Sequence, residues 1–256
     1  MVASLHHVEA GRADGPVVVL GTSLGTSTAM WEPQIPTLAE RCRVVVLDHR
    51  GHGGSEVVEG PATIDDLGGD VLAKLGQLGI DRFSWVGLSL GGMVGMWLAT
   101  RQPERVERMA LVCTAAHLPP AEGWLERAAT VRRDGTAAIA DVVVGRWFTP
   151  GFAARSPAVV DAHRAMLLAT SPEGYASCCE AIAGMDLRRD LPAATVPTLV
   201  IAGAADPATP PSFAEEIAGG IPGARLEVVP DAAHLASVER PAFVTKLLVD
   251  HLVEGS

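Results

Sequence analysis

A serine flanked by glycines is the residue of this sequence best suited to covalent chemistry. Ser89 lies within GLSLG (87–91), directly after the apolar segment 83–86 and directly before a stretch with helical spacing, 93–101. A sharp strand-to-helix turn exposes the serine hydroxyl, and the flanking glycines avoid collisions with neighbouring backbone. The following helix directs its N-terminal dipole toward the point where an oxyanion would form. The motif therefore predicts a nucleophilic serine for acyl transfer.

A serine hydroxyl becomes a good nucleophile only with a base and with a carboxylate that orients this base. For this motif the chain order is nucleophile, acid and histidine, so the histidine has to lie late and in a loop. His234 in loop 230–236 meets both conditions, and Asp206 in loop 203–211 is the matching carboxylate. Asp231 is too near His234 in the chain to face it comfortably. The other histidines lie near the N-terminus, in an early turn or around helical stretches: His6, His7, His49, His52, His117, His163 and His251.

Acyl transfer also needs hydrogen-bond donors aimed at the developing oxyanion. One is the backbone N–H of Leu90, the residue after the nucleophile. The second is expected from loop 21–26 after the first parallel strand, where we assign the N–H of Leu24 and keep that of Ser23 as a close competitor. These are main-chain roles, about which side chains say little. Ser23 is also a candidate contact for the substrate.

The turn DHRGHGGS (48–55) contains two histidines and an arginine, a combination that could also serve chemistry. It follows a strand other than that of the nucleophile, and it precedes both nucleophile and acid in the chain. Its glycines permit a tight reversal of direction. We therefore interpret it as a structural turn rather than as a substrate contact.

The elements that must position these residues alternate between short strands and helices. Apolar runs bounded by turn residues are typical of strands buried on both faces of a parallel sheet. Helical spacing separates them, as over 63–78, where Thr63 and Asp66 form a capping start. A leading antiparallel strand is expected over 4–10. This alternation predicts an α/β fold with a doubly wound, mostly parallel sheet. The expected parallel strands are 17–21, 44–48, 83–87, 109–113, 198–203 and 226–230.

The alternation stops between about residues 115 and 192. This stretch has no convincing strand, only helical segments such as 120–133, 136–147 and 157–168. An all-helical insertion between two strands predicts a cap over the strand ends, where open α/β sheets bind their ligands. The expected division is a core of residues 1–114 and 193–256 with a helical cap of residues 115–192.

Composition and charge argue against several classes of protein. The 256 residues are 48% hydrophobic and 20% charged, which suits one folded domain with an insertion. The formal net charge of -10 argues against nucleic acid and anionic membranes as partners, because both attract basic surfaces. The N-terminus does not resemble a signal peptide, and no apolar run reaches the roughly 18 residues of a spanning helix. Cys42, Cys113, Cys178 and Cys179 lack metal-ligand spacing. We expect a cytoplasmic protein without a metal site.

Six longer segments, spread along the chain, carry a more specific resemblance. They are SLGTSTAMW (23–31), DHRGHGGS (48–55), GLSLGGMVG (87–95), GYASCCEAI (174–182), GAADPATPP (203–211) and AAHLASVERP (232–241). Together with RWFTPGF (146–152) in the insertion, they resemble the 3-oxoadipate enol-lactonase family, which has the α/β-hydrolase fold. The nucleophile, acid and histidine of that family would map to Ser89, Asp206 and His234. At Thr22 the sequence departs from the family, which often has asparagine there.

The resemblance implies hydrolysis of an enol-lactone to 3-oxoadipate, in the β-ketoadipate pathway of aromatic degradation, without metal or organic cofactor. Ser89 would attack the ring carbonyl, His234 would pass the proton to the leaving enolate oxygen, and activated water would then release the acyl group. The small-molecule substrate carries a carboxylate, so a cation is expected in the cap.

The cap offers several candidate substrate contacts. Arg132, Arg133 and Arg146 are the candidate cations for the substrate carboxylate. Trp124 and Trp147 are candidates for the pocket wall, although aromatic residues of a helical insertion more often pack in its own core.

Rival interpretations share most of these features. Another carboxylesterase or lactonase of the same fold would differ mainly in the cap, and a cofactor-free perhydrolase would use the same three side chains. A haloalkane dehalogenase is disfavoured because it needs a carboxylate where Ser89 stands. A hydrolase-like ligand receptor would keep the fold without turnover, and labelling by a fluorophosphonate would distinguish it. The sequence does not indicate an oligomeric state.

Overall fold

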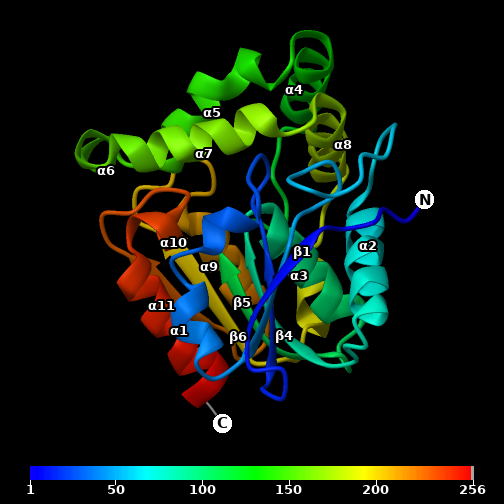
Figure 1. Cartoon of the computed structure of the whole chain (residues 1–256), viewed down its shortest axis with the longest axis vertical. Helices are drawn as coiled ribbons and strands as arrows, with labels where there is room; N and C mark the ends of the chain where they lie inside the picture. The colour runs from blue at the N-terminus through cyan, green and yellow to red at the C-terminus, as the bar shows by residue number, and fades with distance from the viewer. Residues whose placement is uncertain (255–256) are drawn as a thin grey trace.

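A seven-stranded sheet forms the centre of the molecule in the computed structural model, which describes residues 1–254 (Figure 1). Strands β2 to β7 run parallel, and β1 pairs antiparallel with β3. This confirms the predicted α/β class and mostly parallel sheet, including a leading antiparallel strand. Across the sheet the order is β1 (His7–Gly11), β3 (Arg43–Leu47), β2 (Val17–Gly21), β4 (Phe83–Leu88), β5 (Val106–Val112), β6 (Thr198–Gly203) and β7 (Arg225–Val229).

The order of the strands creates a switch point at β2. From β2 the chain moves outward to β3 and then returns to the other side of β2 to form β4. Gly21 at the end of β2 is paired in register with Gly87 near the end of β4. The loop after β2 and the turn after β4 therefore lie side by side at the carboxyl edge, where doubly wound sheets bind their ligands.

Helices cover both faces of the sheet (Figure 1). On one face α1 (Ile35–Ala39) and α11 (Pro241–Val249) contact each other; on the other α3 (Leu90–Arg101) packs on β2, β4 and β5, beneath α2 (Ile64–Gln77). Because α3 lies between sheet and helix, residues 90–99 are buried on all sides. The capping start of α2 forms as expected, with Thr63 and Asp66 bonded reciprocally. The remaining core elements are η1 (Thr28–Trp31), α9 (Pro211–Gly220), α10 (Ala236–Glu239) and η4 (Asp250–Glu254).

The insertion between β5 and β6 forms a layer of helices above the carboxyl edge of the sheet, at the top of Figure 1. An isolated antiparallel bridge between His117 and Asp186 closes its neck. Within it α4 packs on α8, and α5 on α7. None of the described helices has the length and apolarity needed to cross a membrane. The elements of the insertion are α4 (Ala121–Asp134), η2 (Thr136–Ile139), α5 (Ala140–Trp147), α6 (Pro150–Arg155), α7 (Pro157–Ala169) and α8 (Pro172–Ala183), with η3 (Leu191–Ala193) leading back to β6.

Candidate active site

Ser89 lies at the sharp turn between β4 and α3, in a backbone conformation that few residues other than glycine adopt. Its φ is 55° and its ψ is -112°, a strain that persists only where the surrounding structure enforces it. A Cβ on Gly87 would lie 2.1 Å from the carbonyl oxygen of Gly91, and one on Gly91 would lie 2.4 Å from that of Gly21. Both flanking positions therefore require glycine. The turn holds Ser89 at the carboxyl edge, where it lines a cavity.

His234 and Asp206 reach the same edge from two separate loops. His234 lies between β7 and α10, and Asp206 follows β6. Nδ1 of His234 is 2.8 Å from Oδ2 of Asp206, and both side chains are almost fully buried. Since a carboxylate can only accept a hydrogen bond, Nδ1 carries the proton and Nε2 remains the basic nitrogen. His234 lines the same cavity as Ser89, so the structure brings the three predicted side chains together.

The Asp206 carboxylate is held by the turn that follows it. Its Oδ1 accepts the N–H of Ala208 at 2.8 Å and that of Thr209 at 3.0 Å, and its Oδ2 accepts the Thr209 hydroxyl at 2.6 Å. Burial raises the pKa of Asp206, but the charge of His234 and the hydrogen bonds from His234 and Thr209 outweigh it and leave this pKa below its ordinary value. Asp206 is thus ionised and suited to stabilise an imidazolium. Sequence reasoning missed Thr209, although a hydroxyl three residues after a turn aspartate was a usable signal.

Proton transfer from Ser89 needs one further contact. Within residues 1–254, no hydrogen bond joins the Ser89 hydroxyl to the imidazole of His234. Catalytic hydrogen bonds are often long or poorly aligned without substrate and tighten in the complex. We therefore expect the Ser89–His234 hydrogen bond to form when substrate fills the cavity.

Two backbone N–H groups are placed to serve as oxyanion donors. Leu90 is the first residue of α3, so its N–H has no partner inside the helix. In the loop after β2, the N–H of Ser23 donates to Sδ of Met30 at 3.2 Å. The N–H of Leu24 has no acceptor among residues 1–254. This difference favours Leu24 over Ser23 as the second donor, while Ser23 still lines the cavity.

A cavity of about 220 Å³ opens between the insertion and the carboxyl ends of the strands. Its wall is mostly apolar with a few polar groups, as in sites for small organic molecules. The predicted contacts Trp124, Arg146 and Trp147 are among its lining residues. The core contributes Ser23, Leu24, Ser89, Ala208, Thr209 and His234.

Arg127 is a cavity cation that sequence reasoning missed. Its guanidinium carbon lies 4.5 Å from the ring centroid of Trp124, three residues earlier on the same face of α4. It also lies beside the buried phenol of Tyr175, whose pKa is raised by burial, so the hydroxyl keeps its proton. Among residues 1–254, no carboxylate forms an ion pair with Arg127 or with Arg146. The spacing from Trp124 was the available signal.

The prediction that Arg132 or Arg133 faces the substrate is wrong, because neither lines the cavity. At 3.6 residues per turn, Arg132 lies about 140° further round α4 than Arg127. Its guanidinium faces α8, where it contacts the carboxylates of Glu173 and Glu180 at 2.5 to 2.8 Å. Arg133 is exposed and pairs with the aspartate that follows it. The charge of each arginine is already matched by an acidic residue of the protein.

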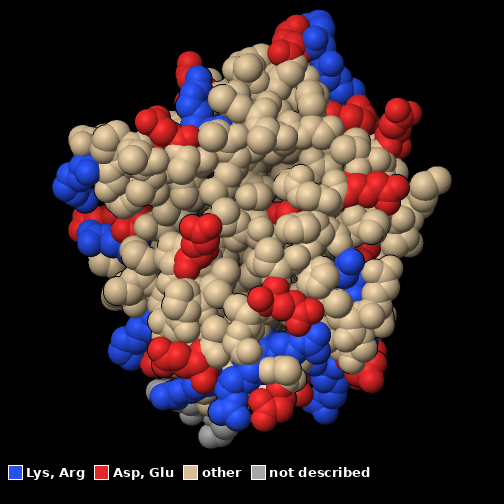
Figure 2. Space-filling model, viewed as in Figure 1, with Lys and Arg blue, Asp and Glu red and all other residues tan. Residues whose placement is uncertain are grey.

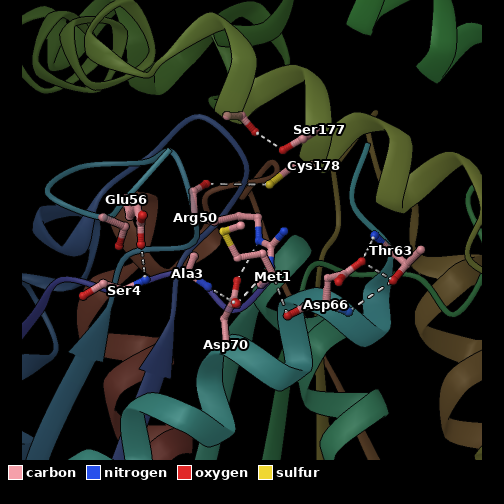
Figure 3. Close-up of polar contacts among 12 residues, drawn as sticks. Met1, Ala3, Ser4, Arg50, Glu56, Thr63, Asp66, Asp70, Ser177 and Cys178 are labelled. Atoms are coloured by element: carbon pink, nitrogen blue, oxygen red, sulfur yellow. Dashed lines mark hydrogen bonds and ion pairs between the residues drawn. The ribbon is translucent and has the colours of Figure 1, made fainter. Parts of the chain in front are cut away.

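The side chains of the turn 48–55 are used in internal contacts. Arg50 makes two hydrogen bonds to Asp70 of α2, at 2.6 and 2.9 Å, and Asp70 also accepts the N–H of Ala3 (Figure 3). His49 and His52 each bond a backbone carbonyl oxygen. None of these residues is among the described residues that line the cavity, which supports the interpretation of a structural turn.

Charge is distributed unevenly over the molecule. Figure 2 shows acidic and basic side chains interspersed around the rim of one face, a few acidic side chains nearer its middle, and a largely uncharged area across the upper part of the face. Within residues 1–254, no group of three His, Cys, Asp or Glu side chains is placed to hold a metal ion. Arg127 and Arg146 both line the cavity of a chain whose net charge is -10.

Known proteins are similar to this chain over nearly its whole length. A family model described as the alpha/beta hydrolase fold matches residues 16–241. The 3-oxoadipate enol-lactonase 2 of Acinetobacter baylyi is 42% identical, over 93% of this chain and 89% of that protein. The crystal structure of an enol-lactonase from Burkholderia xenovorans LB400 is 44% identical with a TM-score of 0.95, over 97% of this chain and 96% of that one. A thermophilic esterase from Thermogutta terrifontis, with malate bound, is 32% identical with a TM-score of 0.93, over 98% and 93%.

Proposed function

Because this chain belongs to the 3-oxoadipate enol-lactonase family of α/β hydrolases and is a hydrolase of esters or lactones, we propose that it opens the enol-lactone of 3-oxoadipate through an acyl-enzyme on Ser89. The observation that carries this proposal is one cavity lined by a serine, a carboxylate-oriented histidine and two arginines that form no ion pair with an acidic side chain among residues 1–254. The reaction would place the enzyme in the β-ketoadipate pathway of aromatic degradation.

Acylation begins with proton transfer from the Ser89 hydroxyl to Nε2 of His234. The serine oxygen attacks the lactone carbonyl carbon, and the negative charge that forms on the carbonyl oxygen is stabilised by the N–H groups of Leu24 and Leu90. The ring C–O bond then breaks, and His234 returns the proton to the leaving enolate oxygen. The enol, which remains part of the acyl chain on Ser89, tautomerises to the ketone. Asp206 keeps the imidazole in the productive tautomer throughout.

Deacylation uses the same groups with water as the nucleophile. His234 accepts a proton from water, the hydroxide attacks the acyl carbon, and the tetrahedral intermediate collapses with release of the Ser89 oxygen, which regains the proton. The enzyme returns to its starting state and 3-oxoadipate leaves. Apart from Asp206, which acts through His234, the groups that take part border the cavity or belong to the turn at Ser89.

The substrate carboxylate provides the selectivity. A guanidinium matches a carboxylate with two parallel hydrogen bonds, and the apolar cavity wall strengthens this contact. Arg127, held against the Trp124 ring, is the better placed of the two arginines because it is half-buried. Arg146 is more exposed and therefore contributes less. Trp147 covers the side of the cavity next to His234.

The decisive test compares the enol-lactone with simple esters. The enol-lactone, generated in place, should be consumed with loss of its ultraviolet absorbance, and the wild type should be labelled by a fluorophosphonate. Ser89→Ala should abolish both turnover and labelling. The likeness to an esterase supports a carboxylesterase as the second candidate. Faster turnover of neutral esters than of the enol-lactone would favour that candidate, and absence of any labelling would refute a serine hydrolase.

A further inference from the structure

The loop that carries His234 is held on both sides of the histidine, and its carbonyl oxygens at Ala232 and Ala233 also accept hydrogen bonds from Ala205 and Cys113. The N–H of Leu235 donates to the carbonyl oxygen of Trp147 at 2.9 Å, and the N–H of Ala233 donates to Oε2 of Glu239 at 2.9 Å. Both acceptors lie outside the loop, since Trp147 ends the cap helix α5 and Glu239 ends α10. The hydrogen bond of Nδ1 orients the imidazole ring, but these backbone bonds determine where the ring is placed.

Glu239 is a buried carboxylate, 6% exposed, whose other contacts go to a single cap residue. Thr149, between α5 and α6, directs its backbone N–H at Oε1 and Oε2, at 3.1 and 3.3 Å, and donates its hydroxyl to Oε1. The Thr149 hydroxyl also accepts a hydrogen bond from the N–H of Phe152 and thereby caps the N-terminus of α6. The three groups bonded to this carboxylate are all donors, and a carboxylate can only accept. One side chain thus joins the histidine loop of the core to the insertion.

We propose that Glu239 is a positioning residue. It holds the imidazole of His234 opposite Ser89 and fixes the position of this ring relative to Trp147 in the cavity wall. It touches no reacting atom and acts through the backbone of Ala233 and Thr149. A displacement of about 1 Å in a catalytic group can cost about 100-fold in rate, so a small shift of this loop is sufficient to matter. The proposal rests on the function proposed above for the same site.

The substitution Glu239→Gln tests this role with little change of shape. The amide nitrogen can only donate, so it opposes either the N–H of Ala233 or the donors of Thr149. For a neutral aryl ester we expect kcat to fall about 10- to 100-fold, while KM changes by less than about threefold. Fluorophosphonate labelling should slow by a similar factor, because it too requires His234 as base. A lowered melting temperature alone would leave both readouts unchanged in the folded protein.

Matched variants separate positioning from general loosening of the insertion. Glu180→Gln weakens the contact of α8 with Arg132 but touches neither the histidine loop nor Thr149, so kcat should stay within about twofold of wild type. Thr149→Val removes one donor to Glu239 and should lower kcat by about three- to tenfold. Thr149→Ser, which keeps the hydroxyl, should recover at least half of that loss. If Glu239→Gln does not fold, the two Thr149 variants carry the test.

The outcomes distinguish the positioning role from the proposed function. A folded Glu239→Gln variant with kcat within about twofold of wild type overturns the positioning role, as does a Glu180→Gln variant that is equally slow. If the Glu239→Gln variant does not fold, equal kcat values for Thr149→Val and Thr149→Ser overturn the positioning role. A wild type that neither hydrolyses the ester nor is labelled overturns the proposed function and the positioning role with it.

Discussion

Replacing Arg127 by methionine should remove the preference for an anionic lactone over neutral esters that the proposed function implies. The methionine side chain can keep the apolar contact with Trp124, whose ring centroid lies 4.5 Å from the guanidinium carbon, and it removes the charge. Because no acidic side chain among residues 1–254 pairs with Arg127, the substitution leaves no unpaired carboxylate behind. The change also removes the contacts of the guanidinium with Trp124 and Tyr175, and comparison with a neutral substrate separates their effect from that of the substrate carboxylate.

The expected magnitude follows from the half-buried position of this arginine. A hydrogen bond to a charged group contributes about 1.5 to 3 kcal/mol, and about 1.36 kcal/mol corresponds to a tenfold change in rate. We expect kcat/KM for the enol-lactone to fall by about 10- to 160-fold, mainly through KM if ground state and transition state hold the carboxylate equally. Arg146→Met should cost less, about two- to fivefold, because this arginine is exposed.

The assay measures kcat/KM for the enol-lactone and for a neutral aryl ester with each variant. Arg133→Met is the matched control, since it removes one positive charge from the same helix at an exposed position outside the cavity. The control should leave both substrates unaffected, and Arg127→Met should affect only the anionic one. Equal losses for both substrates in Arg127→Met, or no loss at all, would refute the assignment of Arg127 to the carboxylate.

Two further substitutions test the carboxylate that orients His234 and the buried turn 48–55. Asp206→Asn should lower kcat by about 10⁴-fold with little effect on KM, because an amide stabilises the wrong tautomer of His234; steady-state kinetics giving less than a tenfold loss would contradict this role. Burial lowers the pKa of His49 to about 3, whereas the unfolded chain takes up this proton near pH 6.5. As the pH falls below 6.5, the free energy of unfolding should therefore decrease by about 1.4 kcal/mol per unit for this group. Urea titrations should give a shallower pH slope for His49→Gln, and equal slopes would exclude the effect.

The elements of the fold could be predicted from sequence because their signals are local. Strands β2 and β6 occupy exactly the buried apolar runs that the sequence contains, and α2 begins where Thr63 and Asp66 form a capping box. The sequence predicted a helical insertion but did not delimit the short helix α6 or the cap helix α8. The first has six residues, and the second is buried through packing on α4 rather than through a clear apolar stripe of its own.

The candidate catalytic residues could also be proposed from sequence, since their positions follow from the order of elements. Ser89 stands at a strand-to-helix turn, and Asp206 and His234 stand in loops that follow strands. Parallel strands bring their carboxyl ends to one edge, so residues more than a hundred positions apart in the chain are predictable neighbours. No comparable rule exists for the insertion, whose helices can pack over the edge in many orientations.

The amino-acid sequence by itself determined the type of sheet and the family and singled out the candidate nucleophile, because these depend on local patterns and on their order along the chain. Only the tertiary structure decided which cap arginines line the cavity, that the N–H of Ser23 donates to Met30 whereas that of Leu24 has no acceptor among residues 1–254, and that Glu239 joins the histidine loop to the insertion. Each of these depends on the rotation of a helix or on an acceptor brought close from a distant segment. Such geometry arises from packing and has no signature in neighbouring residues.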